Sequence, residues 1–195
     1  MMNKLSFIKD FDFSKLDFVL LTLFLVLGFF GLLILSSASA HFSDSIYGNP
    51  SDIFNRQFFY FIFGIIGLFV CFFIPLNFWS SYDRLFITFG ILLLFSVFIP
   101  GIGIEVNGAN RWIRIAGFGL QPSEIMKFLS ILYISCYSVR RIKDIQTHWL
   151  GFFRPAVIIV SIISIILIQP DLGSSAVIFI SVLGILFVAG VKIQQ

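Results

Sequence analysis

The sequence predicts an all-α integral membrane protein with about six transmembrane helices. Hydrophobic residues make up 58% of the chain and charged residues only 12%, whereas soluble domains carry about 25% charged residues. The mean hydropathy is +1.02. Apolar runs long enough to cross a bilayer core of about 30 Å alternate with polar, turn-forming stretches. Since backbone polar groups in lipid must be satisfied within each segment, helices are the expected spanning elements.

The apolar runs predict six helices, and residues 1–195 are expected to form a single polytopic membrane domain. The fifth run is short by itself, so its helix is expected to begin before Pro155. Polar stretches separate the helices: "SSASAHFSDSIYGNPSD", "NFWSSYDR", the segment 101–121 and "RRIKDIQTHWLGFFR". The expected helices cover residues of about 17–36, 57–76, 84–100, 122–139, 153–168 and 171–191.

The first apolar run has two interpretations. The "ASA" at Ala38–Ala40 has the small residues of a signal-peptidase site. However, the run before it is longer than the 7–15 residues of a signal-peptide core. Acidic residues also stand where a signal peptide carries a simple basic region. A retained membrane anchor is therefore favoured.

The sequence gives little support for a metal site, a redox site or a nucleic-acid-binding site. Cys71 and Cys136 lie far apart inside apolar runs, without the spacing of a redox or zinc motif. His41 and His148 are isolated, so no metal-ligand cluster is expected. The net charge of +3 is small and gives no sign of nucleic-acid binding.

Lysine and arginine placement predicts the orientation, because cytoplasmic segments of multipass proteins carry an excess of these residues. The outer segments would hold Arg56, Arg111 and Arg114, with Lys127 just inside the fourth helix. We therefore expect a cytoplasmic N-terminus and an outer position for segment 101–121. The cytoplasmic segments would then hold Lys4, Lys9, Lys15, Arg84, Arg140, Arg141, Lys143, Arg154 and Lys192.

The stretch "QPSEIMK" opens the fourth predicted helix. Proline is favourable at the first helical position, so Pro122 is expected there, with Glu124 in the first turn. Glu124 and Lys127 are three residues apart and share a helix face. In one interpretation Glu124 complements the helix dipole while Lys127 extends to the membrane surface. The functional interpretation is favoured, because ionisable residues inside a membrane usually face a partner or a wet cavity.

The stretch "QPDLG" repeats this arrangement at the sixth predicted helix, where Asp171 also meets the helix dipole. The two Gln-Pro helix starts are expected to line a polar cavity open to the outer leaflet. Arg111 can bind a phosphate or carboxylate in a forked geometry. Trp112 fits an aromatic belt at the membrane interface about as well as a ligand contact. The predicted substrate-cavity residues are Arg111, Trp112, Gln121, Ser123, Glu124, Lys127, Gln169 and Asp171.

These segments also carry a resemblance to a known family. "PGIGIEVNGANRWIRIAGFGLQPSEIMKF" and "ILIQPDLGSSAVIFISVLGILFVAG" resemble the two strongest signatures of the SEDS family (shape, elongation, division and sporulation) of bacterial cell-wall polymerases. "ILSSASA", "NRQFFYFIFG", "VRRIKD" and "GFFRP" look like the same family. "PGIGIEVNG", "SVRR" and "LFVAGVKIQQ" are more similar to its septal FtsW branch than to its RodA branch.

The resemblance implies a peptidoglycan glycosyltransferase in the bacterial inner membrane, part of a bundle of about ten helices. Such an enzyme polymerises lipid II, an undecaprenyl-pyrophosphate-linked substrate, at the outer face during cell division. It implies a class B penicillin-binding transpeptidase and other divisome proteins as partners. No cofactor is certain, and a divalent cation beside the pyrophosphate stays open. Arg111 and Lys127 would stabilise the leaving pyrophosphate.

The catalytic base is expected elsewhere. The family's proposed catalytic aspartate lies in an outer loop after the seventh helix, which would fall beyond Gln195. We therefore expect this chain to be the N-terminal part of a family member, with no catalytic residue of its own and no activity alone. The sequence leaves open the choice between division and elongation.

Two other functions compete with the polymerase. A lipid II flippase would use the same cavity but needs a polar path through the membrane, whereas the charges within predicted spans cluster at the outer end. A non-catalytic division scaffold would not need the cavity residues, so removing the charge of Arg111 or Lys127 would leave growth unaffected.

Overall fold

The computed structural model describes residues 16–106, 108–115 and 118–191, without the side chains of Ile115 and Phe118. Contacts between residues divide the chain into two compact units, Met1–Pro75 and Leu76–Gln195. Each unit is described by itself. The predicted basic residues Lys4, Lys9, Lys15 and Lys192 lie outside the described residues.

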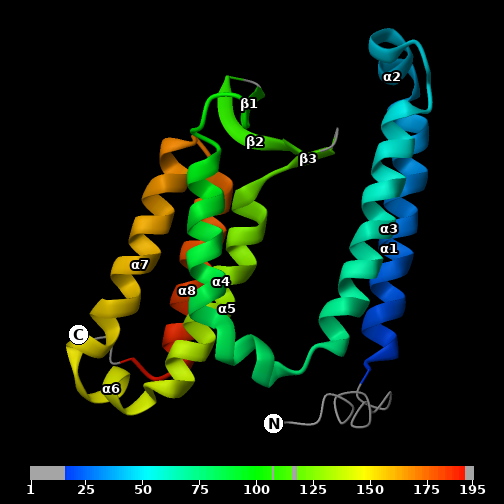
Figure 1. Ribbon diagram of the computed structural model, residues 1–195. Coiled ribbons are helices and arrows are strands. Elements are labelled where there is room, and N and C mark those ends of the chain that lie inside the picture. Colours follow the sequence, from blue (N-terminus) through cyan, green and yellow to red (C-terminus); the bar gives the residue numbers. More distant parts are fainter. Residues whose placement is uncertain (1–15, 107, 116–117, 192–195) are drawn as a thin grey trace, which may run out of the picture. The chain divides into compact units, whose positions relative to one another are not determined.

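The first unit is a pair of long helices joined by a short one (Figure 1). The side chain of Asp17 caps the first long helix by accepting the backbone N–H of Leu20 at 3.0 Å. The two long helices meet at Gly28, where a side chain would collide with the ring of Phe61. Most of their apolar side chains are exposed, as suits helices that face lipid. The elements are α1 (Phe18–Ala38), α2 (Ala40–Tyr47) and α3 (Asp52–Phe73).

The second unit packs four long helices around one apolar core. Figure 1 shows that the long helices that follow one another in sequence run in opposite directions, so α5 and α8 run in the same direction, and a small sheet lies beyond the end of α4. The helices are α4 (Leu76–Ser96), α5 (Pro122–Arg140), α6 (Ile142–Thr147), α7 (Trp149–Ile168) and α8 (Leu172–Val188). The core consists of Ile87, Leu94, Met126, Leu129, Tyr133, Ile134, Ile159, Ile162, Ile166, Ile178, Val182 and Leu186.

A three-stranded antiparallel sheet connects α4 to α5, in the order β1-β2-β3. The strands are β1 (Gly103–Val106), β2 (Ala109–Ile115) and β3 (Phe118–Leu120). Trp112 pairs with Ile104 and Asn110 pairs with Glu105, which leaves Arg111 as an extra residue on β2. This irregularity is a β-bulge, a feature that redirects side chains.

Four of the described helices are long and apolar enough to cross a membrane: α1, α3, α4 and α7. The helix α8 is also apolar but has only 17 residues. The helix α5 has 19 residues and carries Glu124, Lys127 and Arg140. Length and composition alone therefore support four of the six predicted spans.

The polar stretches hold more regular structure than the sequence predicts. The stretch "NFWSSYDR" forms the first turns of α4, which begins at Leu76 rather than near residue 84. It can be helical because Asp83 finds a cationic partner on α5. The helices α3 and α7 also begin earlier than predicted, at Asp52 and Trp149. The segment 101–121, predicted as a loop, contains the sheet. That residues 1–195 form one membrane domain stays a prediction.

Candidate functional site

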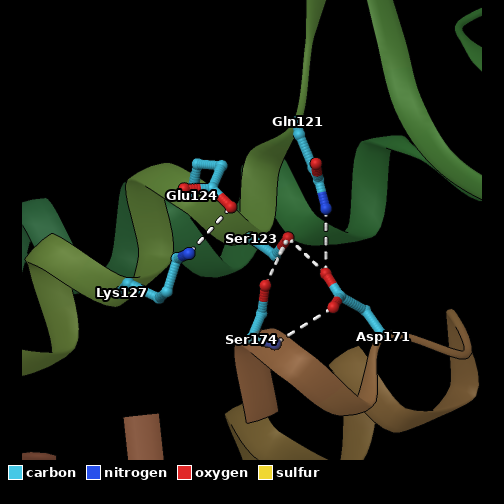
Figure 2. Close-up of polar contacts among 6 residues, drawn as sticks. All are labelled: Gln121, Ser123, Glu124, Lys127, Asp171 and Ser174. Carbon is cyan, nitrogen blue, oxygen red and sulfur yellow. Dashed lines mark hydrogen bonds and ion pairs between the residues drawn. The ribbon is translucent and has the colours of Figure 1, made fainter. Parts of the chain in front are cut away.

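The starts of α5 and α8 meet through the carboxylate of Asp171 (Figure 2). One carboxylate oxygen, Oδ2, accepts hydrogen bonds from Gln121 Nε2 at 2.9 Å and from the Ser123 hydroxyl at 2.8 Å. The other oxygen, Oδ1, accepts the backbone N–H of Ser174 at 3.0 Å. Asp171 is 7% exposed. We call Gln121, Ser123, Asp171 and Ser174 the carboxylate network.

Local sequence positions each member of the carboxylate network. Pro122 occupies the first turn of α5, where its missing N–H leaves no donor unpaired. This fixes Gln121 just before the helix and Ser123 just inside it. Asp171 is the N-cap of α8, and its side chain accepts one of the N–H groups that a helix start leaves free. The Ser174 hydroxyl lies 3.4 Å from that of Ser123, so small side chains let the two helices approach closely.

The hydrogen bonds keep Asp171 ionised. Burial alone would raise the pKa of this carboxyl, which lies just before α8. The hydrogen bonds from Ser174, Ser123 and Gln121 outweigh burial and leave its pKa below the ordinary value. Both carboxylate oxygens are engaged by donors. Asp171 is therefore suited to holding two helix starts together and poorly suited to accepting a proton.

Glu124 and Lys127 form the ion pair that their spacing predicts. Lys127 Nζ lies 2.7 Å from Glu124 Oε1, and the side chains are 23% and 58% exposed, respectively. Figure 2 shows this pair on α5 beside the carboxylate network. The ammonium thus has a fixed partner close to the start of α5, where it also stays partly accessible.

Arg111 and Trp112 lie on the sheet, and β2 contacts α5. The Nε of Arg111, the bulged residue of β2, is buried and has no hydrogen-bond partner among the described residues. A Cβ atom added at Gly119 would lie 3.3 Å from the ring of Trp112, so the indole packs on that glycine. In the described part of the chain, no hydrogen bond or ion pair joins Arg111 or Trp112 to the carboxylate network or to the Glu124–Lys127 pair.

Gln169 makes a contact of a different kind. Its Nε2 donates to the backbone oxygen of Leu94 at 3.0 Å, and the residue is 1% exposed. This bond ties the turn between α7 and α8 to the end of α4. The Oε1 atom of Gln169 is buried without a partner in the part of the chain that the structure describes.

Two members of polar clusters are not predicted by the sequence. Nothing local predicts Ser174, because no motif ties this serine to Asp171. The sequence predicts a linker around Asp83, yet this residue is 1% exposed and both of its oxygens accept hydrogen bonds from Arg140, at 2.8 and 2.6 Å. The missing signal is the length of α4: once "NFWSSYDR" is helical, an acid inside a spanning helix requires a partner. Among the described residues, no three His, Cys, Asp or Glu side chains gather as metal ligands would.

Curated relatives match nearly the whole chain. It is 34% identical over 183 residues to a probable peptidoglycan glycosyltransferase FtsW from Saccharophagus degradans, covering 94% of this chain and 47% of the relative. It is 35% identical over 195 residues to the protein of the same name from Wigglesworthia glossinidia brevipalpis, covering 100% of this chain and 50% of the relative. The chain thus spans about half the length of these relatives.

Solved structures share the fold. A chain from a peptidoglycan synthase complex that coordinates polymerization and crosslinking matches with a TM-score of 0.64 at 23% identity, over 85% of this chain and 48% of that chain. The rod shape determining protein RodA of Thermus thermophilus matches with a TM-score of 0.62 at 23% identity, over 83% of this chain and 54% of that chain. The predicted all-α membrane fold is therefore confirmed.

The sequence pattern of one protein family covers most of the chain. The FtsW/RodA/SpoVE family, described as cell cycle proteins, matches residues 17–195. This match includes every helix of both units and the whole candidate site. The resemblance to the SEDS polymerases noted in the sequence is confirmed, and the chain belongs to the FtsW/RodA/SpoVE family of multipass membrane proteins.

Proposed function

We propose that this chain is part of a peptidoglycan glycosyltransferase that polymerises lipid II into glycan strands. The support is the name shared by relatives that are about 35% identical over nearly the whole chain. We place the reaction at the outer face of the bacterial inner membrane, at the division septum, with the N-terminus in the cytoplasm. This placement follows the lysine and arginine bias of the sequence.

The carboxylate network is the observation that carries the proposal. It joins two helix starts that lie 48 to 50 residues apart in sequence. Because Asp171 is buried and saturated with donors, the start of α5 is held in one place. Glu124 and Lys127 then project from a fixed helix end. A cationic group held in advance is what electrostatic stabilisation of a leaving pyrophosphate requires.

Lys127 and Arg111 supply the positive charge in this proposal. Lys127 Nζ lies 2.7 Å from Glu124 Oε1, and the lysine side chain is 23% exposed. Arg111 is half-buried on the sheet, and a guanidinium can donate to a phosphate oxygen in a forked geometry. Trp112, next in sequence, offers a flat apolar face for the sugar or for the lipid. Gln121, Ser123 and Asp171 act by fixing the helix starts, and Gln169 by fixing α4.

Neither acid of the site is assigned as the general base. Asp171 has a lowered pKa and no free oxygen. Glu124 already accepts a hydrogen bond from Lys127 at 2.7 Å. General-base assistance is worth about 10²–10⁴ in rate, and we propose that another acid of the intact protein supplies it.

A class B penicillin-binding transpeptidase and other divisome proteins are the proposed partners. The support is the fold shared with a chain of a peptidoglycan synthase complex, together with the glycosyltransferase name of the relatives. We propose no resident metal, and leave to experiment whether a divalent cation accompanies the pyrophosphate.

The proposal is tested by Lys127→Met in the intact protein, incubated with labelled lipid II and the partner transpeptidase. We expect glycan polymerisation to fall by about a hundredfold, as when one preorganised donor is removed from an enzyme site. Lys143→Met is the matched control, because Lys143 is an exposed lysine on α6. Membrane abundance and thermal stability should be equal in all three proteins.

The outcomes separate the competing functions. Normal polymerisation by Lys127→Met would contradict the proposed site. Absent polymerisation by the wild-type protein, with lipid II transport that depends on Lys127, would indicate a flippase. If cells grow normally with a variant in which the charges of both Lys127 and Arg111 are removed, the protein acts as a scaffold.

A further inference from the structure

A cavity lies in the second unit, between the first turns of α4 and the last turns of α5. Its volume is about 1030 Å³. It is remote from the carboxylate network, because α5 begins at that network and ends at this cavity. The lining combines apolar, hydroxyl and charged side chains, with Leu76, Trp79, Ser81, Arg84, Val139 and Arg140 among them.

The cavity carries an excess of positive charge. Asp83 neutralises Arg140 through two hydrogen bonds, at 2.8 and 2.6 Å. Arg140 also donates to the backbone oxygen of Ser80 at 3.1 Å. These contacts use three of the five N–H groups of an arginine side chain, so Arg140 is held in place with donors to spare. Arg84 is exposed, and its guanidinium has no hydrogen bond or ion pair with any described residue.

The cavity lies where lipid headgroups are expected. The helix α4 has 21 residues and meets the length and composition of a membrane span. At about 1.5 Å per residue it covers about 30 Å, the thickness of a bilayer core. Its first turns therefore lie at a membrane interface. Trp79 lines the cavity and its ring lies 5.3 Å from that of Phe86, and tryptophan is enriched at this depth.

We propose that this cavity binds the headgroup of an anionic phospholipid. Arg84 and the spare donors of Arg140 bind the phosphate, and Ser81 and Asn77 are placed to bind the glycerol oxygens. Leu76, Leu132 and Val139 contact the acyl chains. A zwitterionic lipid brings its own cation, which the excess positive charge repels, so an anionic lipid is preferred. This inference does not depend on the proposed glycosyltransferase activity.

The fluorescence of Trp79 can measure which lipid occupies the cavity. The chain has three tryptophans, so Trp112→Phe and Trp149→Phe, together with Phe in place of any tryptophan elsewhere in the intact protein, leave Trp79 as the single reporter. The intact protein is placed in nanodiscs of phosphatidylcholine that contain an equal mole fraction of either brominated phosphatidylglycerol or brominated phosphatidylcholine. Bromine quenches tryptophan fluorescence on contact, so the ratio of the two quenching efficiencies reports lipid preference at the cavity.

We expect brominated phosphatidylglycerol to be preferred about fivefold, the effect of one cation near an anionic headgroup. Arg84→Gln should remove the preference, so that both lipids quench equally, and Arg84→Lys should retain part of the preference. The matched control is Arg114→Gln, because Arg114 is an exposed arginine on the sheet, away from the cavity. Thermal melting of each variant verifies that the bundle is intact. Arg84 is a suitable residue to substitute, because its side chain is exposed and has no partner among the described residues.

Four results would overturn the proposal. The first is equal quenching by both lipids in the wild-type protein. The second is an unchanged preference in Arg84→Gln. The third is loss of the preference on adding inorganic phosphate, which would indicate a site for a free anion rather than a lipid. Persistent protection of Trp79 from both brominated lipids would likewise overturn it, since a protein segment would then fill the cavity.

Discussion

The carboxylate of Asp171 accepts the hydroxyl hydrogen bond of Ser123 at 2.8 Å, across 48 residues of sequence. This contact joins the start of α8 to the start of α5 at one end of the helix bundle. A buried carboxylate is costly unless donors surround it, and here Gln121 and Ser174 complete the set. The stability of the helix starts therefore depends on the charge of one residue.

The first prediction concerns pH. Because the folded pKa of Asp171 lies below its ordinary value of 3.8, its ionised form stabilises the native state above that ordinary value. The contribution is lost as pH falls through the lowered folded pKa. Asp171→Asn should destabilise the protein by about 1–3 kcal/mol at neutral pH, the usual effect of losing hydrogen bonds to a buried charge. The difference from wild type should shrink below about pH 4.

Thermal unfolding in an acid-tolerant detergent measures this difference. Asp144→Asn is the control, because Asp144 is 44% exposed and pairs with Arg141 near the end of the bundle. Its effect should stay small at every pH. A destabilisation by Asp171→Asn that does not change with pH would show that the charge is not the cause.

The second prediction concerns Asp83 and Arg140. Either Asp83→Asn or Arg140→Gln leaves a buried or half-buried charge without its partner. We expect each to destabilise the bundle by about 2–4 kcal/mol, less than the loss of a fully buried pair because Arg140 is 33% exposed. The double variant should be less destabilised than the sum of the two single variants.

A double-mutant cycle by thermal unfolding tests this coupling. The exposed pair Arg141–Asp144, at 3.0 Å, serves as the control cycle. Its coupling should lie below about 1 kcal/mol, as is usual for surface ion pairs. Equal coupling in the two cycles would contradict a special role for the Asp83–Arg140 pair.

The third prediction concerns the contact of α4 with α5. A side chain at Gly90 would approach Met126 Sδ to 2.7 Å and Leu129 Cδ1 to 2.8 Å. Both neighbours are buried. Gly90→Ala should therefore destabilise the bundle by about 1 kcal/mol through overpacking, although alanine is the better helix former.

Gly184→Ala is the matched change, because Gly184 lies within α8 with no atom within 4 Å of an added Cβ. It should leave stability unchanged or raise it by up to about 1 kcal/mol. Thermal unfolding compares the two variants. A stabilising Gly90→Ala would mean that α4 and α5 can separate without cost.

The fourth prediction concerns orientation. Cysteines are introduced at Asn110 on the sheet and at Lys143 on α6, both exposed, after Cys71 and Cys136 are replaced by serine. In intact cells a membrane-impermeant thiol reagent should label Asn110→Cys. It should label Lys143→Cys only after permeabilisation. The reverse pattern would invert the orientation and move the candidate site to the cytoplasmic face.

The sequence by itself determined the features that depend on spacing along the chain. Apolar runs of membrane length predict α1, α3 and α7, and Pro122 predicts the start of α5. The Glu124–Lys127 pair follows from helix geometry, since residues three apart share a face. These contacts form within one or two helical turns, so no other part of the fold has to be known.

Only the tertiary structure decided which distant groups meet. Nothing local pairs Asp171 with Ser123, or Asp83 with Arg140, which are 57 residues apart. Gln169 has the same Gln-Pro context as Gln121, yet it binds the backbone of Leu94 while Gln121 binds Asp171. The physical reason is that a buried polar group takes whichever partner packing brings within reach. That choice depends on how the helices pack and not on the motif that contains the group.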